Sequence, residues 1–128
     1  MRKLLPFVLL LMLNFGCHTK LNQESTVSLT NIEAKHFLIK PISKEQVINV
    51  SAKSTEGTFN VFVFLEKDKN EAVAAIEKTK LDDSKVLNHK LKTPEAELQA
   101  TIPANETAIV YLVSADGKKA EVKLKISN

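Results

Sequence analysis

The residue best suited to chemistry in this sequence is its single cysteine, Cys17, because a thiol is both a strong nucleophile and an attachment point for lipid. A single cysteine excludes an intrachain disulfide, and the sequence lacks the grouped cysteines and histidines of a zinc site. The segment that precedes Cys17 therefore decides what this thiol is used for.

That segment, MRKLLPFVLLLMLNFGC, has the features of a secretory signal peptide. Arg2 and Lys3 form a positively charged start, and residues 4–13 are a ten-residue run that is apolar except for Pro6. The run is too short for a membrane-spanning helix, which needs about 20 apolar residues. Residues 1–16 are therefore predicted to be a signal peptide.

The end of this segment resembles the lipobox of bacterial lipoprotein precursors. Gly16 and Cys17 match the lipobox, whereas Asn14 and Phe15 stand where an aliphatic and a small residue are usual. The resemblance implies cleavage before Cys17, a diacylglyceryl group on its sulfur, and a further acyl chain such as palmitate on the new amino terminus. It also implies a protein anchored in the cell membrane or outer membrane, facing the periplasm or the exterior. His18, in place of an aspartate, favours the outer membrane.

Two other interpretations of Cys17 are a buried free thiol and ordinary secretion with cleavage nearby. The first fits poorly because Cys17 follows the apolar run and precedes the predicted folded part. The second fits poorly because Asn14 and Gly16 make a weak cleavage site.

Other chemistry-bearing residues do not form recognisable sites. His36 and His89 are isolated in sequence, and we expect them to be independent rather than joint metal ligands. The serines lie outside any GxSxG motif. The carboxylate pairs Asp82-Asp83 and Glu95/Glu97 have the spacing of solvated charge. We therefore expect no enzyme activity, no metal and no cofactor.

Charge and aromatic content limit the partners. The net charge of +3 falls to +1 once the signal peptide is removed, and Arg2 is the only arginine, so nucleic acid is not an expected partner. Lys123 and Lys125 share one face of a predicted strand. Either they contact anionic lipid headgroups, or they block edge-to-edge aggregation, which is the commoner use of strand lysines.

Exposed aromatic residues would favour carbohydrate stacking. The phenylalanines of the mature part are expected in the core, namely Phe37, Phe59, Phe62 and Phe64. Tyr111 is the one candidate for an exposed ring.

The chain is 128 residues long, which suits one domain. Residues 17–33 are predicted to be the lipidated cysteine and a flexible tether, because they are polar with scattered aliphatics, although their end can contribute a short strand. Residues 34–128 are predicted to form the domain.

Strand patterns cover residues 34–40, 46–52, 59–65, 85–92, 95–102, 107–114 and 119–126. A short helix is predicted over residues 71–78, with Asn70 as its N-cap.

This pattern predicts an all-β fold, an antiparallel β-sandwich of about seven strands, immunoglobulin-like or jelly-roll-like, with one short helix. Asp116-Gly117 predicts a hairpin turn between the last two strands. The succession FNVFVFL, a short insertion, and LQATIPANETAIVYLVSADGKKAEVKLKI resembles pre-peptidase C-terminal domains, which implies the same sandwich.

Together these observations predict a non-catalytic lipoprotein of the bacterial cell envelope whose sandwich binds another envelope protein or supports an assembly. The alternative is a small-ligand or glycan-binding module, with its site on a sheet face or in loops near Tyr111 and His89.

Overall fold

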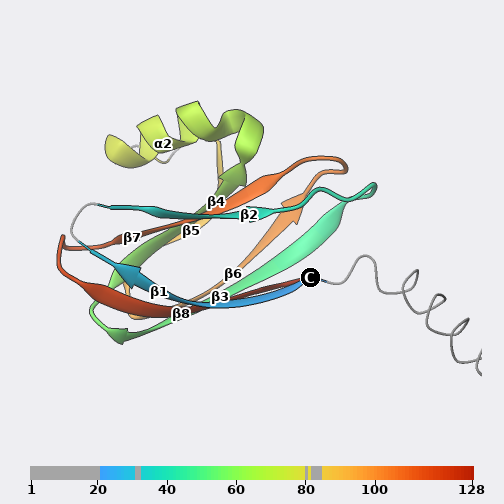
Figure 1. Cartoon of the computed structure of the whole chain (residues 1–128). Coiled ribbons are helices and arrows are strands. Elements are labelled where there is room, and N and C mark those ends of the chain that lie inside the picture. Colours follow the sequence, from blue (N-terminus) through green and yellow to red (C-terminus); the bar gives the residue numbers. More distant parts are fainter. Residues whose placement is uncertain (1–20, 31–32, 80, 82–84) are drawn as a thin grey trace, which may run out of the picture.

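Alternating apolar and polar residues build the strands of this protein into two packed antiparallel sheets (Figure 1). The structure, a computed structural model, describes residues 21–30, 33–79, 81 and 85–128. Sheet A contains, in spatial order, β1 (Asn22–Leu29), β8 (Ala120–Ser127), β3 (Gln46–Glu56) and β6 (Glu95–Ile102). Sheet B contains β2 (Lys35–Ile39), β7 (Ala108–Ser114), β4 (Phe59–Leu65) and β5 (Val86–Thr93). The predicted β-sandwich is confirmed.

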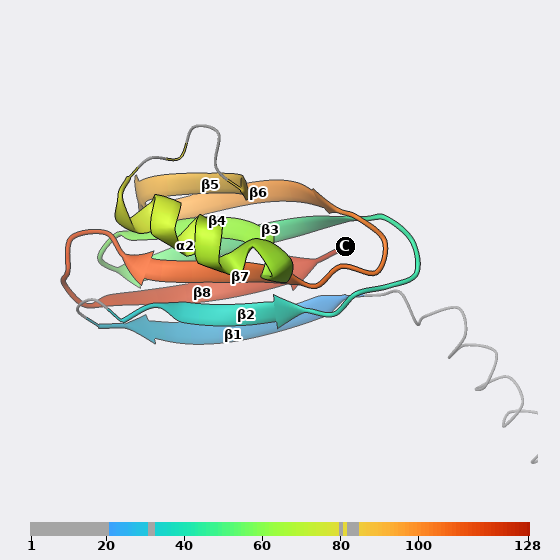
Figure 2. The ribbon, with the colours of Figure 1, turned by 90° about the horizontal axis from the view of Figure 1, so that it is seen from above.

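The two sheets differ in what covers their outer faces. In β6 and β8, alternate residues are buried and exposed, because one face packs on the core and the other meets water. In β4 and β7 nearly every residue is buried, because α2 (Lys69–Glu77) covers the outer face of sheet B. Figure 2 shows α2 lying across these two strands.

The strand order identifies the sandwich as a jelly roll rather than an immunoglobulin-like fold. Consecutive strands lie in opposite sheets, except for β4 and β5, which pair within sheet B around the helical segment. The turn at Asp116-Gly117 therefore passes from sheet B to sheet A. The expected turn is present, but the hairpin that it was predicted to close is not, since β7 and β8 do not pair with each other.

The first strand lies within the segment predicted to be a tether. Asn22–Leu29 forms β1 and pairs with the whole length of β8. Val27 and Leu29 enter the core, whereas Glu24, Thr26 and Ser28 are exposed. Two apolar residues give too weak a period for a strand to be recognised, and pairing with the strongly patterned β8 supplies the rest. The sandwich thus begins at β1, and the predicted boundary at residue 34 is wrong.

The helix begins earlier than predicted. A turn of 3₁₀-helix, η1 (Glu66–Asp68), runs directly from β4 into α2, and Asp68 is the N-cap residue of α2. Asn70, the predicted N-cap, lies within the first turn of the helix. Ala72 on this helix is buried in one cluster with Phe62, Phe64 and Tyr111.

The two glycines at turns between the sheets differ in how much space surrounds them. Gly57 and Gly117 both have left-handed backbones, with φ of +76° and +77°. A Cβ added at Gly57 would lie 2.6 Å from the backbone oxygen of Lys119, whereas one at Gly117 would meet nothing within 4 Å.

We expect Gly117→Ala to lower the free energy of unfolding by about 1–2 kcal/mol, the cost of a left-handed non-glycine residue. Gly57→Ala should cost roughly 1–3 kcal/mol more, because the overlap with Lys119 is added to the same backbone cost. Urea unfolding of both variants measures the difference. Equal losses would show that the turn around Gly57 can relax.

Candidate functional site

The outer face of sheet A, called face A below, is an almost wholly polar surface on four strands. Its side chains form cross-strand rows, because residues opposite one another in the register share a face. The rows are Thr26, Lys123, Lys53 and Glu95; Glu24, Lys125, Ser51 and Glu97; and Asn22, Ser127, Asn49 and Gln99.

Hydrogen bonds tie several of these side chains together. Ser51 Oγ donates to Glu97 Oε2 at 3.3 Å, and Gln99 Nε2 donates to Asn49 Oδ1 at 3.0 Å. These bonds join β3 to β6. The carboxylate of Glu97, one of the pair predicted to be solvated charge, is exposed and held by Ser51.

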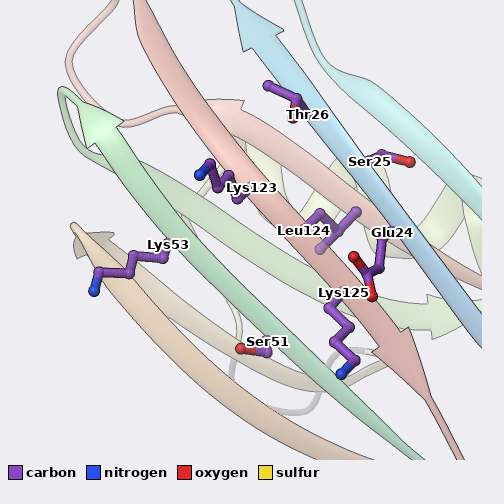
Figure 3. A pocket seen from close by; sticks show the side chains of 8 residues that line it. All are labelled: Glu24, Ser25, Thr26, Ser51, Lys53, Lys123, Leu124 and Lys125. Atoms are coloured by element: carbon purple, nitrogen blue, oxygen red, sulfur yellow. The ribbon is translucent and has the colours of Figure 1, made fainter.

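The lysines of face A are not used in this way. Lys53 and Lys123 lie directly opposite each other on neighbouring strands, and Lys125 is two residues along β8. Among the described residues, none of the three has a carboxylate within 4.0 Å. Figure 3 shows their ammonium groups well apart around the centre of the face. Their charges are therefore available to a ligand.

Two shallow hollows adjoin on face A. One, of about 500 Å³, is lined by Glu24, Ser25, Thr26, Ser51, Lys53, Lys123, Leu124 and Lys125 (Figure 3). The other, of about 600 Å³, is lined by Asn49, Val50, Ser51, Glu97, Leu98, Gln99, Lys125 and Ser127. Ser51 and Lys125 belong to both. The hollows offer ammonium, carboxylate, amide and hydroxyl groups, which suit reversible binding of a polar ligand, and neither contains an aromatic ring or a histidine.

The lysines of β8 were predicted to block pairing at a sheet edge, and this is wrong. Strand β8 lies between β1 and β3, so Lys123 and Lys125 occupy the middle of sheet A. Edge status cannot be seen in a single strand, because it depends on which strands pair. The edges of sheet A are β1 and β6, and those of sheet B are β2 and β5.

The outer face of sheet B carries a row of rings from all four strands. His36, Tyr111, Phe62 and His89 are successive cross-strand neighbours. His36 stacks on Tyr111 with ring centroids 4.8 Å apart, Tyr111 meets Phe62 edge-on at 6.0 Å, and Phe62 stacks with His89 at 6.1 Å. The two histidines thus cap the ends of an aromatic row and do not meet at one site.

Tyr111 is not the exposed ring that the sequence suggested. Only 9% of it is exposed, because it lies among Phe62, Phe64 and α2. Burial raises the pKa of its hydroxyl, and the nearby charge of Glu77 raises it further. Phe59, Phe62 and Phe64 are buried as predicted, whereas Phe37 is half-buried against the core. Tyr111 therefore offers no stacking platform to a carbohydrate.

The remaining predicted residues are quickly placed. Cys17 and the Asp82-Asp83 pair lie outside the described residues. Within the described ranges, no three histidine, cysteine or acidic side chains come together in a way that could hold a metal, and no serine hydroxyl is hydrogen-bonded to a histidine. No helix in the described part of the chain is long and apolar enough to cross a bilayer.

Comparison with known proteins gives structural likeness only. No family model matches the chain, and no curated protein matches its sequence. Among solved structures, the Yersinia pseudotuberculosis-derived mitogen matches with a TM-score of 0.59 and 5% identity, over 84% of this chain and 85% of that one. PliG of Aeromonas hydrophila, a periplasmic inhibitor of g-type lysozyme, matches with a TM-score of 0.57 and 11% identity, over 86% and 88%.

A third match is the pre-peptidase C-terminal domain of a Bacillus anthracis collagenase, with a TM-score of 0.55, 12% identity, and coverage of 83% of this chain and 89% of that one. The resemblance expected from the sequence is thus supported at the level of the fold. At these identities the matches establish the β-sandwich and leave the site to be argued from the residues themselves.

The stacked ring of His36 should make stability depend on pH. Partial burial lowers the pKa of His36, and Lys69 on α2 lowers it further. The unfolded chain, with a histidine pKa near the ordinary 6.5, therefore binds more protons than the folded protein just below that pH. We expect the free energy of unfolding to fall as the pH falls from 7.5 through 6.5, and His36→Gln to flatten this dependence in urea titrations. An identical slope in the variant would contradict this.

The free lysines of face A should contribute nothing to stability. Lys123→Gln removes a like charge from opposite Lys53, so we expect the free energy of unfolding to stay unchanged or to rise by up to about 0.5 kcal/mol. The matched control is Glu121→Gln, whose carboxylate accepts a hydrogen bond from Ser28 and lies 3.9 Å from Lys119. The control should not stabilise. A loss above about 1 kcal/mol for Lys123→Gln would assign Lys123 a structural role.

Proposed function

We propose that this chain is a lipid-anchored protein of the bacterial cell envelope, whose β-sandwich is a non-catalytic module that binds another envelope component or supports an assembly. One observation carries the proposal. The apolar core is assembled from residues between Val27 and Ile126, so a chain cleaved before Cys17 keeps the whole sandwich. The signal-like segment and Cys17 are then left for export and anchoring.

The physics of the anchor supports a durable attachment. Each buried methylene contributes about 0.8 kcal/mol, and two or more acyl chains hold a protein on a bilayer where a single chain exchanges. A diacylglyceryl group on Cys17 together with an acylated amino terminus meets this requirement.

The chemistry of the described side chains supports a binding role rather than catalysis. On face A, Ser51 is hydrogen-bonded to Glu97 and Gln99 to Asn49, and His36 and His89 are stacked on the outer face of sheet B. A nucleophile, a base and an orienting group are therefore not brought together on face A. The structurally similar proteins are described as a mitogen, a lysozyme inhibitor and a pre-peptidase domain.

The surfaces that suit a protein partner are the edge strands. Edge strands present unpaired backbone groups that can accept a further strand. On β5, Leu87 and Leu91 are 42% and 47% exposed. A partner that adds a strand along β5 would cover both leucines.

A second function, binding of a small polar ligand or glycan, is favoured by one feature only. The adjoining hollows on face A contain Lys53, Lys123 and Lys125, which form no ion pair within 4.0 Å among the described residues, beside Glu24 and Glu97, and three lysines against two carboxylates favour an anionic over a neutral sugar. The burial of Tyr111 removes the stacking contact that a neutral glycan would use.

The anchor is tested by replacing the acylated atom. We expect Cys17→Ser to move the protein from the membrane fraction to the soluble fraction and to abolish incorporation of labelled palmitate, because serine offers no sulfur for the diacylglyceryl group. Fractionation and labelling in a bacterial host measure both.

The matched control is Asn14→Leu, which restores the aliphatic residue usual in a lipobox and keeps Cys17. This variant should label at least as strongly as the native chain. Membrane retention of Cys17→Ser, or absence of label in both proteins, would refute the anchor.

A further inference from the structure

The beginning of β1 fixes how far the sandwich can be from an anchor at Cys17. Asn22 is the first residue of β1, five residues after Cys17. A fully extended chain spans at most about 3.3–3.6 Å per residue, so the start of β1 lies within roughly 18 Å of an acylated Cys17. The tether is therefore much shorter than residues 17–33 suggested.

The start of β1 and several other segments lie together at one end of the sandwich, which is called the anchor end below. These are the C-terminal residue Asn128, the loop 40–45 between β2 and β3, and the loop 103–107 between β6 and β7. Figure 1 shows both loops on the same side as the marked C-terminus. The turns at Gly57, Pro94 and Gly117 lie at the opposite end, called the far end.

Hydrogen bonds bind the start of β1 to the rest of the anchor end. The backbone N–H of Leu21 donates to Asn128 Oδ1 at 2.9 Å, and Asn128 Nδ2 donates to Gln46 Oε1 at 3.2 Å. Gln46, 8% exposed, donates through Nε2 to the backbone oxygen of Lys40 at 3.3 Å. The link continues between the loops, where the N–H of Asn105 donates to the oxygen of Ile42 at 2.7 Å. The start of β1 is thus joined by hydrogen bonds to both loops.

The anchor end also carries exposed apolar side chains beside lysines. Leu38 and Val47, 54% and 44% exposed, lie two residues before and two residues after the loop 40–45, Leu38 on the outer face of sheet B and Val47 on face A. Lys40 and Lys44 in that loop are exposed, and so is Glu45, which leaves the loop with a net positive charge. Leucine, valine and lysine stems are the side chains that enter the headgroup region of a bilayer, with the ammonium groups remaining at its surface.

Away from the anchor end, the broad faces of the sandwich lack this combination. The β5 edge has exposed Leu87 and Leu91 beside Lys90 and Lys92, but it lies on the opposite side of the sandwich from β1 (Figure 2). Face A is polar along its rows, and the exposed side of α2 carries Lys69, Asn70, Glu71 and Glu77. If the sandwich were inverted, with the far end on the membrane, the tether would have to span the length of a strand. An eight-residue strand is roughly 26 Å long, which exceeds the reach of about 18 Å.

We propose that the anchored sandwich stands end-on, with the anchor end and its loop 40–45 in contact with the lipid headgroups and the far end directed away from the membrane. This posture rests on the proposed anchoring. It follows that the far-end turns and the distal half of β5 are the parts presented to a soluble partner, whereas the loop 40–45 is occupied by lipid.

The posture is tested on the full, membrane-bound protein with single fluorophores. An acylated Cys17 leaves no other thiol in the chain, so a cysteine introduced at an exposed site is the only one to label. The four sites are Ser43 in the anchor-end loop, Lys118 at the far end, Lys90 on the β5 edge and Thr26 on face A. The bilayers contain lipids with a nitroxide headgroup, which quench a fluorophore that approaches them.

We expect quenching at Ser43→Cys to exceed that at Lys118→Cys by at least about twofold, because the far end is roughly a strand length farther from the headgroups. Lys90→Cys and Thr26→Cys should fall between them. Quenching at Lys118 equal to that at Ser43 would overturn the posture, and stronger quenching at Lys90 or Thr26 than at Ser43 would replace it with a sandwich lying on that side.

Two controls distinguish failure of the proposed posture from failure of the proposed anchoring. Inserting about fifteen glycine and serine residues between Lys20 and Leu21 gives a flexible tether of roughly 22–27 Å, so the contrast between Ser43 and Lys118 should collapse. Mass spectrometry of the same preparations reports acylation at Cys17. An unacylated protein refutes the proposed anchoring and the posture with it, whereas an acylated protein with equal quenching refutes the posture alone.

Discussion

The packing of two apolar sheet faces against each other is the interaction on which the rest of this structure depends. Leu29, Phe59 and Val122 are wholly buried between the sheets, together with residues from all strands but β5. The burial of such side chains is the main driving force for folding, and it requires that each strand present its apolar face inward. Sheet pairing, the crossing turns and the position of every outward-facing side chain follow from that requirement.

The outer faces of the two sheets differ in which side chains they expose to water. Sheet B buries the centre of its outer face too, where Tyr111 and Phe62 lie under α2 and the exposed rings of His36 and His89 stack at the two ends of the row. Its histidines and tyrosine are thereby used in packing. Sheet A leaves its outer face in water, and a face of mixed charges with free lysines suits reversible polar contact.

The ends of the sandwich are as different as its faces. All the strands run along one axis, so the start of β1 assigns one end to the chain's amino-terminal segment. The link from Leu21 through Asn128 and Gln46 to the loop 40–45 makes that end a single hydrogen-bonded unit. An anchor placed a few residues before β1 therefore acts on a rigid body and not on a loose strand.

Most of the strands and the helix could be predicted from the sequence, because a period of two in segments such as 95–102 and 119–126 depends only on which residues are apolar. It also determined the signal-like segment and the position of Cys17, which are local patterns. For β1 it indicated no more than a short strand at the end of residues 17–33, because the two core residues of β1 give no clear period and its pairing comes from β8. Three features became visible only in the folded protein: β7 and β8 lie in different sheets, Lys123 is central in its sheet, and Tyr111 is buried. Edge position, burial and cross-strand neighbours are properties of strand order, and strand order is set by long-range pairing that no single segment encodes.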